Sequence, residues 1–140
     1  MTEMEAIELL KHHSYNHEDI KHPKTEKGFL GMLRPLDGQL SEDNFHEIMT
    51  ILKTLKRHFK DDKIDRQIIS SFWGICHFAK AWGLDEKGML RRNNLLNEKQ
   101  IKQLSVWIEC ISYAVMGLLD GMDDEDAFEL YKLYLEDNKK

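Results

Sequence analysis

Four histidines near the N-terminus are the first residues whose type and spacing could do chemistry. They are His12, His13, His17 and His22. His13 and His17 are four residues apart, so on a continuous helix they would share one face and could share a metal ion. The motif H-E-x-x-H is missing, and Asn16 and Pro23 indicate that the helix ends before His17. We therefore interpret the histidines as solvated side chains at a helix C-terminus, and predict no metal and no cofactor.

Two other groups resemble chemical motifs but have unsuitable spacing. Cys76 and His77 are neighbours, and neighbouring side chains on a helix point about 100° apart, so they do not form a nucleophile with its base. We expect a buried structural thiol and a histidine at the core or its boundary. The acidic run Asp120–Asp126 fails as an EF-hand loop because Met122 occupies a ligand position. We interpret the run as carboxylates that favour a helix N-terminus.

The densest group of hydrogen-bond donors is the run Arg91, Arg92, Asn93 and Asn94. Two guanidinium groups and two amides suit the recognition of a carboxylate or a phosphate. A structural account stays open beside this one, in which the arginines pair with nearby carboxylates and the asparagines satisfy helix ends. The carboxylates of that account are Asp85, Glu86 and Asp37.

A candidate pocket follows if this donor run lies over the helices. Its lining would be Trp73, His77, Trp107 and Glu109, with Arg34 and Asp37 adding to a polar rim. The candidate ligand-binding residues are thus Arg91, Arg92, Asn93, Asn94, Arg34, Asp37, His77 and Glu109. The chain has no P-loop, dinucleotide fingerprint, nucleophile elbow or paired C-x-x-C motif, so we predict no catalytic residue.

Helical patterns must position these residues. Gln103–Leu119 contains a single charged residue, Glu109, and apolar residues recur there at spacings of three and four, which predicts a helix buried on most sides. Asn97 starts this helix, with Gln100 at the capping-box position. Gln67–Leu84, with Lys80 as its only formal charge, predicts a second such helix packed against the first. A third apolar seam runs from Phe45 to Phe59 after a cap at Ser41, and we expect the three tryptophans to be mainly core residues.

The remaining segments complete an all-α prediction. A capping box at Thr2 starts a helix that runs to about Tyr15 with an apolar face of Met4, Ile7, Leu9 and Leu10. Asn16–Lys27 is a predicted loop with one helical turn at His17–Lys21, and Gly28–Gln39 is an irregular apolar loop folded over the helices, with a turn at Pro35–Gly38. Asp61 or Asp62 caps the helix that follows the Phe45–Phe59 seam, and Asp123 or Asp124 caps the last helix. We predict one domain, 1–140: a bundle of about five helices with two central buried helices.

Composition limits the function. The 140 residues carry a net charge of −5 without a stripe of basic residues, which argues against nucleic acid and favours a basic protein partner. Gln103–Leu119 is short for a membrane span and carries Glu109 near its middle, so we predict no membrane contact. Cys76 and Cys110 lie in apolar segments and no signal peptide is seen, as is typical of a cytoplasmic protein.

Two functional classes remain open. The first is a small acidic protein-interaction domain of bacterial type without catalytic activity, with neutralisation of a basic protein, in the manner of an immunity protein or antitoxin, as its sharper form. The second is a small-ligand-binding protein or enzyme with a pocket near Arg91–Asn94. The seam from Phe45 to Phe59 can pair across a homodimer as readily as within one chain.

Overall fold

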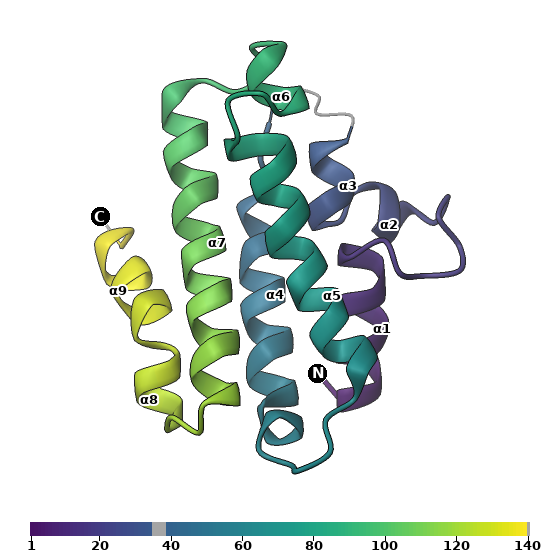
Figure 1. The fold of residues 1–140 in the computed structure, drawn as a ribbon, viewed down its shortest axis with the longest axis vertical. Coiled ribbons are helices and arrows are strands. Elements are labelled where there is room, and N and C mark those ends of the chain that lie inside the picture. The colour runs from purple at the N-terminus through teal and green to yellow at the C-terminus, as the bar shows by residue number, and fades with distance from the viewer. Residues whose placement is uncertain (35–38, 140) are drawn as a thin grey trace.

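The computed structural model describes residues 1–34 and 39–139, of which 71% are helical, without a strand. Five of the helices have seven or more residues, which confirms the all-α class. The long helices run side by side, and short helical turns connect them (Figure 1). The predicted turn at Pro35–Gly38 lies outside the described residues.

Helix α7 (Glu98–Leu119) is the longest element and lies between α9 and α4 (Figure 1). The predicted capping box is present: the Asn97 side chain accepts from the Gln100 N–H, and the Gln100 side chain accepts from the Asn97 N–H. The helix contacts α4, α5, α8 and α9 (Figure 1). Ile108 and Ile111 are fully buried, as the apolar spacing predicts.

Helix α4 (Glu42–Leu55) continues into a 3₁₀ turn, η1 (Lys56–Phe59), and supplies another part of the core. The whole predicted seam from Phe45 to Phe59 is buried. The rings of Phe45 and Trp107 stack with their centroids 5.4 Å apart, which joins α4 to α7. Helix α1 (Glu3–His13) also packs against α4, so α4 is covered by both α7 and α1.

Helix α5 (Arg66–Ala79) begins at an Asp65 cap, so the prediction that Asp61 or Asp62 caps this helix is wrong. It ends in a π-helical turn, η2 (Lys80–Leu84). Its inner face buries Ile68, Phe72, Ile75 and Ala79. The opposite face is open: Trp73 is 74% exposed, so the prediction of a core role for this tryptophan is wrong.

The N-terminal connection differs from the prediction in its details. Met4 is exposed, because α1 buries only a narrow stripe that includes Leu10. Within the predicted loop Asn16–Lys27, the short helix is α2 (Pro23–Glu26) and not the predicted turn at His17–Lys21. A proline suits the first position of a helix. The predicted irregular apolar loop contains α3 (Phe29–Leu33), and its buried side chains confirm that this segment packs on the bundle.

The C-terminal helices complete the fold. After α6 (Met89–Arg92) and α7, the predicted residue Asp123 caps α8 (Asp124–Ala127) by accepting from the Asp126 N–H at 2.9 Å. The predicted single last helix is divided, because a separate helix begins after Phe128. Helix α9 (Glu129–Asp137) is held by a chain of hydrogen bonds. The Trp107 indole donates to the Tyr134 hydroxyl at 3.1 Å, and that hydroxyl donates to Glu42 on α4 at 3.0 Å.

Candidate functional site

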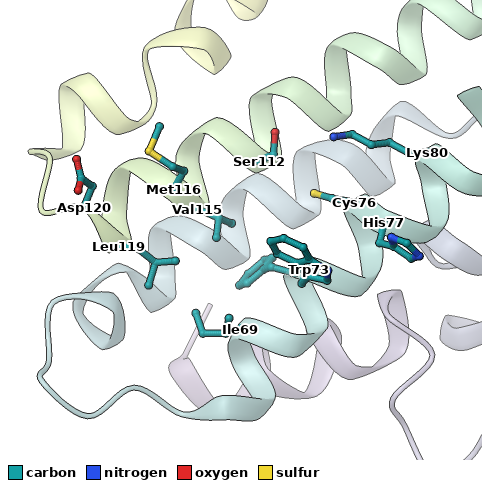
Figure 2. A pocket seen from close by; sticks show the side chains of 11 residues that line it. Ile69, Trp73, Cys76, His77, Lys80, Ser112, Val115, Met116, Leu119 and Asp120 are labelled. Carbon is teal, nitrogen blue, oxygen red and sulfur yellow. The ribbon is translucent and has the colours of Figure 1, made fainter.

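An apolar groove of about 490 Å³ lies between α5 and α7 (Figure 2). Its walls come from one side of each helix: Ile69, Phe72, Trp73, Cys76, His77 and Lys80 on one, Ser112, Val115, Met116, Leu119 and Asp120 on the other. Trp73, Met116 and Leu119 are 74%, 48% and 47% exposed. Large apolar side chains gathered in one exposed groove are typical of a binding surface, whereas scattered ones are ordinary.

Helical spacing explains why this groove is apolar. Ile69, Trp73 and His77 are four residues apart, so they form a stripe along α5 beside the buried face. Val115 and Leu119 form the matching stripe on α7 (Figure 2). The two stripes therefore border one hollow without belonging to the core.

The two ends of the groove differ in charge. Lys80 lies at one end and Asp120 at the other (Figure 2). Leu119 also lines an adjoining hollow, which contains Asp61, Asp62, Asp123 and Lys60. The Lys60 ammonium lies 3.6 Å from a carboxylate oxygen of Asp124, so this cation already has an acidic partner. The Asp120 end of the groove is thus acidic and the Lys80 end carries one positive charge.

The thiol in the groove is poorly suited to nucleophilic chemistry. Burial raises the pKa of Cys76 to about 11, so this group is protonated at neutral pH. Burial also raises the pKa of Cys110 to about 11. Both cysteines are free thiols. A protonated thiol suits a structural role for Cys76, but its side chain is only partly buried. His77 is exposed, so the prediction of a histidine at the core or its boundary is wrong.

The predicted donor run is occupied in part by local hydrogen bonds. The Arg91 guanidinium donates to the Leu84 carbonyl at 2.9 Å, and the Asn93 amide donates to the Met89 carbonyl at 2.8 Å. Asn94 has a φ of 54°, a left-handed conformation that asparagine tolerates. Arg92 is exposed. These contacts give Arg91 and Asn93 local structural roles, but the partner of Arg91 is a backbone carbonyl and not one of the predicted carboxylates.

Arg34 and Asp37 were predicted to lie beside this run. The Arg34 guanidinium lies 5.6 Å from the centre of the Trp82 ring, a cation–π contact with η2, which itself packs on α6. Asp37 lies outside the described residues. Arg34 is therefore placed at the same end of the bundle as the donor run.

The four residues of the predicted pocket lining do not surround one cavity. Trp73 and His77 line the α5–α7 groove. Trp107 is fully buried against Phe45, and Glu109 is exposed and lines a separate hollow that includes Tyr134. Sequence reasoning placed Trp73 and His77 at a site but missed the α7 side of the groove. Val115 and Leu119 were counted with the apolar face of the buried helix because they continue or widen its spacing, and Met116 was not considered.

The N-terminal histidines are the clearest correction. His12 and His13 are buried, so the interpretation of solvated side chains is wrong for both. The His13 ring accepts from the Phe29 N–H at its Nδ1 and bonds Glu47 through its Nε2, each at 2.9 Å. The chain turns back after α1 and brings His17 beside Glu8 and His12, three residues whose types can hold a metal ion.

Comparison of the chain with protein-family models, with curated proteins and with solved structures finds no match. Among the helices of residues 1–34 and 39–139, none has the length and apolar character needed to cross a membrane.

Proposed function

We propose that the chain is a non-catalytic protein-interaction domain whose α5–α7 groove binds an amphipathic helix of a basic partner protein. The observation that carries the proposal is the exposure of Trp73 in an apolar groove. Tryptophan is enriched among the residues that dominate binding energy at interfaces. A helix with apolar residues at i, i+3, i+4 and i+7 is the usual ligand of such a groove.

The charges around the groove select the partner. Asp120, Asp61, Asp62 and Asp123 lie at or beside one end, whereas Lys80 is the charged residue that lines the other. A helix with lysine or arginine at the end next to Asp120 would complement this pattern. A second copy of the chain, docked groove to groove, would bring to this acidic end the single lysine that lines its own groove. The proposal therefore favours a different, basic protein over a homodimer.

Neutralisation of a basic protein, in the manner of an immunity protein or antitoxin, is the sharper form of this function. The acidic end of the groove favours it, because complementary charge speeds the encounter of two proteins. In this form the domain occludes the partner's working surface. Co-expression of the partner with the wild-type chain should protect the host cell, and co-expression with Trp73→Ala should not.

In-cell photo-crosslinking tests the proposal. A photoreactive benzoylphenylalanine replaces Trp73 in one variant and Leu133 in a control, since Leu133 is exposed on α9 and does not line the groove. We expect a defined crosslink from position 73, mapped to an amphipathic helix with basic residues, and none of this kind from position 133. The complex must then reassemble from the two purified proteins.

Two results would overturn the proposal. One is a crosslink from position 73 only to a second copy of the chain, with a dimer in light-scattering measurements of the purified protein. The other is reassembly of the purified complex with unchanged affinity when Trp73→Ala replaces the wild-type chain.

A further inference from the structure

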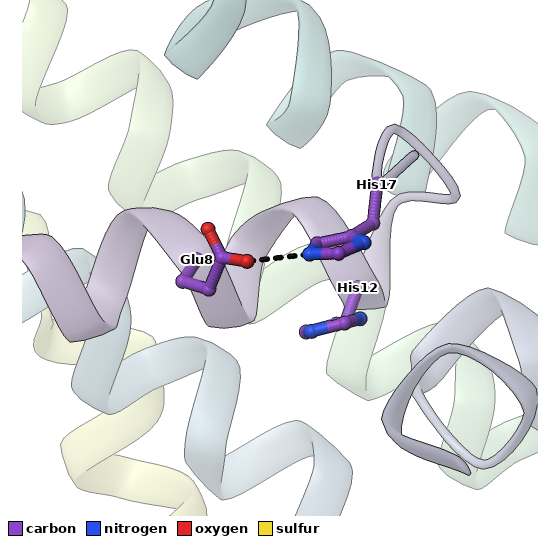
Figure 3. A group of neighbouring side chains, drawn as sticks. All are labelled: Glu8, His12 and His17. Atoms are coloured by element: carbon purple, nitrogen blue, oxygen red, sulfur yellow. Dashed lines mark hydrogen bonds and ion pairs between the residues drawn. The ribbon is translucent and has the colours of Figure 1, made fainter. Parts of the chain in front are cut away.

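A second group of side chains, outside the groove, has the composition of a metal site. Glu8 and His12 lie one helical turn apart on α1, and the loop after α1 returns His17 to the same place (Figure 3). One ligand atom from each of the three residues lies within 4.8 Å of the other two. A rotation of these side chains is enough to bring the three atoms around one ion.

The buried member of the group is held in the tautomer that binds metals. His12 is 5% exposed, and its Nδ1 lies 2.7 Å from the Thr25 hydroxyl. That hydroxyl donates its own hydrogen to the Asp19 carbonyl at 3.2 Å, so it accepts from the His12 Nδ1–H. The lone pair of His12 is therefore on Nε2. A ligating histidine whose other nitrogen donates to an oxygen is the common arrangement in metal sites.

The other two members of the group, exposed Glu8 and partly buried His17, already share a proton. The Nε2 of His17 bonds the Glu8 carboxylate (Figure 3), and the Asp19 N–H donates to the Nδ1 of the same ring at 3.0 Å. In the neutral ring the proton is therefore on Nε2, between the two ligand atoms. A bound cation would take the place of this proton.

We propose that Glu8, His12 and His17 bind a first-row transition-metal ion such as Zn²⁺, with water in the fourth position. Two imidazoles and one carboxylate form a mixed nitrogen and oxygen set that suits Zn²⁺, Co²⁺ or Ni²⁺, whereas Mg²⁺ and Ca²⁺ prefer oxygen alone. Three protein ligands with one open position are typical of zinc sites that keep a water.

The ionisation of the group supports binding at neutral pH. The hydrogen bond from His17 lowers the pKa of the Glu8 carboxyl below its ordinary value of 4.5, and burial lowers the pKa of His12 below 6.5. Both groups are thus in the deprotonated form that a metal requires.

His22 also stacks on His12, with centroids 4.6 Å apart, but its Nδ1 accepts from the Lys24 N–H and caps α2. We assign His22 no ligand role.

Binding requires one rearrangement, which gives the proposal a distinctive signature. The rings of His12 and His17 are stacked at 3.9 Å with an angle of 14° between their planes. A metal ion lies in the plane of each ring that binds it, so the His17 ring must turn out of the stack. Its Nδ1 then takes up the proton in place of Nε2, and the Asp19 N–H loses its acceptor. The Asp19 amide resonance should therefore shift on metal binding.

The test is a titration of the full chain, stripped with a chelator, with Zn²⁺ in competition with a chromophoric chelator. We expect one Zn²⁺ per chain, little net proton release in calorimetry with two buffers because the His17 proton moves from Nε2 to Nδ1, and a tetrahedral absorption spectrum with Co²⁺. Glu8→Gln and His17→Ala should each weaken Zn²⁺ binding by at least about tenfold. Both positions are on the surface of the fold, so circular dichroism should show native helix in each variant.

Two controls keep the result specific. His77→Ala removes a histidine outside the group and should leave the Zn²⁺ affinity unchanged, and His22→Ala should change it by less than about threefold, within ordinary mutational scatter. The proposal is overturned if the wild-type chain binds no Zn²⁺ at millimolar concentration. It is also overturned if Glu8→Gln and His17→Ala bind Zn²⁺ as the wild type does. None of these results depends on the function of the groove.

Discussion

The Nε2 of His13 lies 2.9 Å from the Glu47 carboxylate, and this contact joins α1 to α4 inside the bundle. The other nitrogen of the ring accepts from the Phe29 N–H at the start of α3. Three segments therefore meet at one buried imidazole. The hydrogen bond from His13 is also the largest cause that lowers the pKa of Glu47 below 4.5.

Replacement of His13 should destabilise the fold. His13→Ala leaves the buried Phe29 N–H without its acceptor and removes a partner of Glu47. We expect the free energy of unfolding to fall by about 2–3 kcal/mol in urea denaturation, in line with the cost of unsatisfied buried polar groups. His77→Ala, at an exposed position, should stay within about 0.5 kcal/mol of wild type. Equal stability of the two variants would contradict a linking role for His13.

Acidification should begin to lower the free energy of unfolding at a higher pH than it would if only carboxylates were titrating. Burial, and then the charges of His17 and His22, lower the pKa of His12 below 6.5. The unfolded chain therefore binds a proton that the folded chain does not, and the free energy of unfolding falls as the pH falls through 6.5 toward the lower folded value. Urea midpoints at several pH values measure this loss.

Direct titration of His12 provides the check. In the metal-free protein, the imidazole resonances of His12 should titrate with a midpoint below 6.5. A midpoint at or above that value would mean that the ring is solvated or paired with a carboxylate, contrary to its contact with Thr25.

The two tryptophans at positions 73 and 107 should behave oppositely. Trp107→Ala removes a fully buried ring and should cost about 3–5 kcal/mol of stability. Trp73→Ala removes a ring that is 74% exposed and should cost less than about 1 kcal/mol. Iodide quenching compares their environments: Trp73→Phe should remove most of the quenchable fluorescence and Trp107→Phe little of it. A large loss of stability in Trp73→Ala would place that ring in the core and remove the basis of the groove.

Alanine replacements at two glycines compare a crowded position, Gly31 in α3, with an open position, Gly74 in α5. A Cβ at Gly31 would lie 2.1 Å from the Thr25 carbonyl oxygen, a backbone atom that cannot move aside cheaply. Gly31→Ala should therefore lower the thermal midpoint by several degrees, and it should also disturb Thr25, the partner of His12. In the middle of α5, a Cβ at Gly74 meets its nearest atom at 4.0 Å.

Gly74→Ala should raise stability by about 0.5–1 kcal/mol, because alanine restricts the unfolded chain and favours helix. Calorimetric melting of both glycine variants measures the effects. A loss of stability in Gly74→Ala that equals the loss in Gly31→Ala would mean that α5 is crowded around Gly74, contrary to the open space that the structure shows there.

The helices could be predicted from the sequence because apolar spacing within one helix depends on neighbouring residues alone. The seam from Phe45 to Phe59 and the cap at Asn97 are examples. The outward face of α5 could be predicted only in part. The spacing of Ile68, Phe72, Ile75 and Ala79 places Phe72 on the buried face, but it does not say whether another helix covers the neighbouring stripe that contains Trp73.

The histidines show the other limit. The burial of His12 and His13 depends on Thr25 and Glu47, which are 13 and 34 residues away in the chain. Local sequence carries no signal for such partners. The site near Arg91–Asn94 stays a prediction for Arg92 and Asn94, whereas Arg91 and Asn93 are engaged in local hydrogen bonds.

The most direct test of the central claim is a comparison of three binding affinities. The partner found by crosslinking from position 73 is purified, and its affinity is measured for the wild-type chain and for two variants. Isothermal titration calorimetry should give a Kd about 30-fold weaker for Trp73→Ala, the loss of an interface hot spot worth about 2 kcal/mol. Leu133→Ala, on α9, should bind as the wild type does. Equal Kd values for all three chains would contradict the account, because the partner would then bind elsewhere than in the α5–α7 groove.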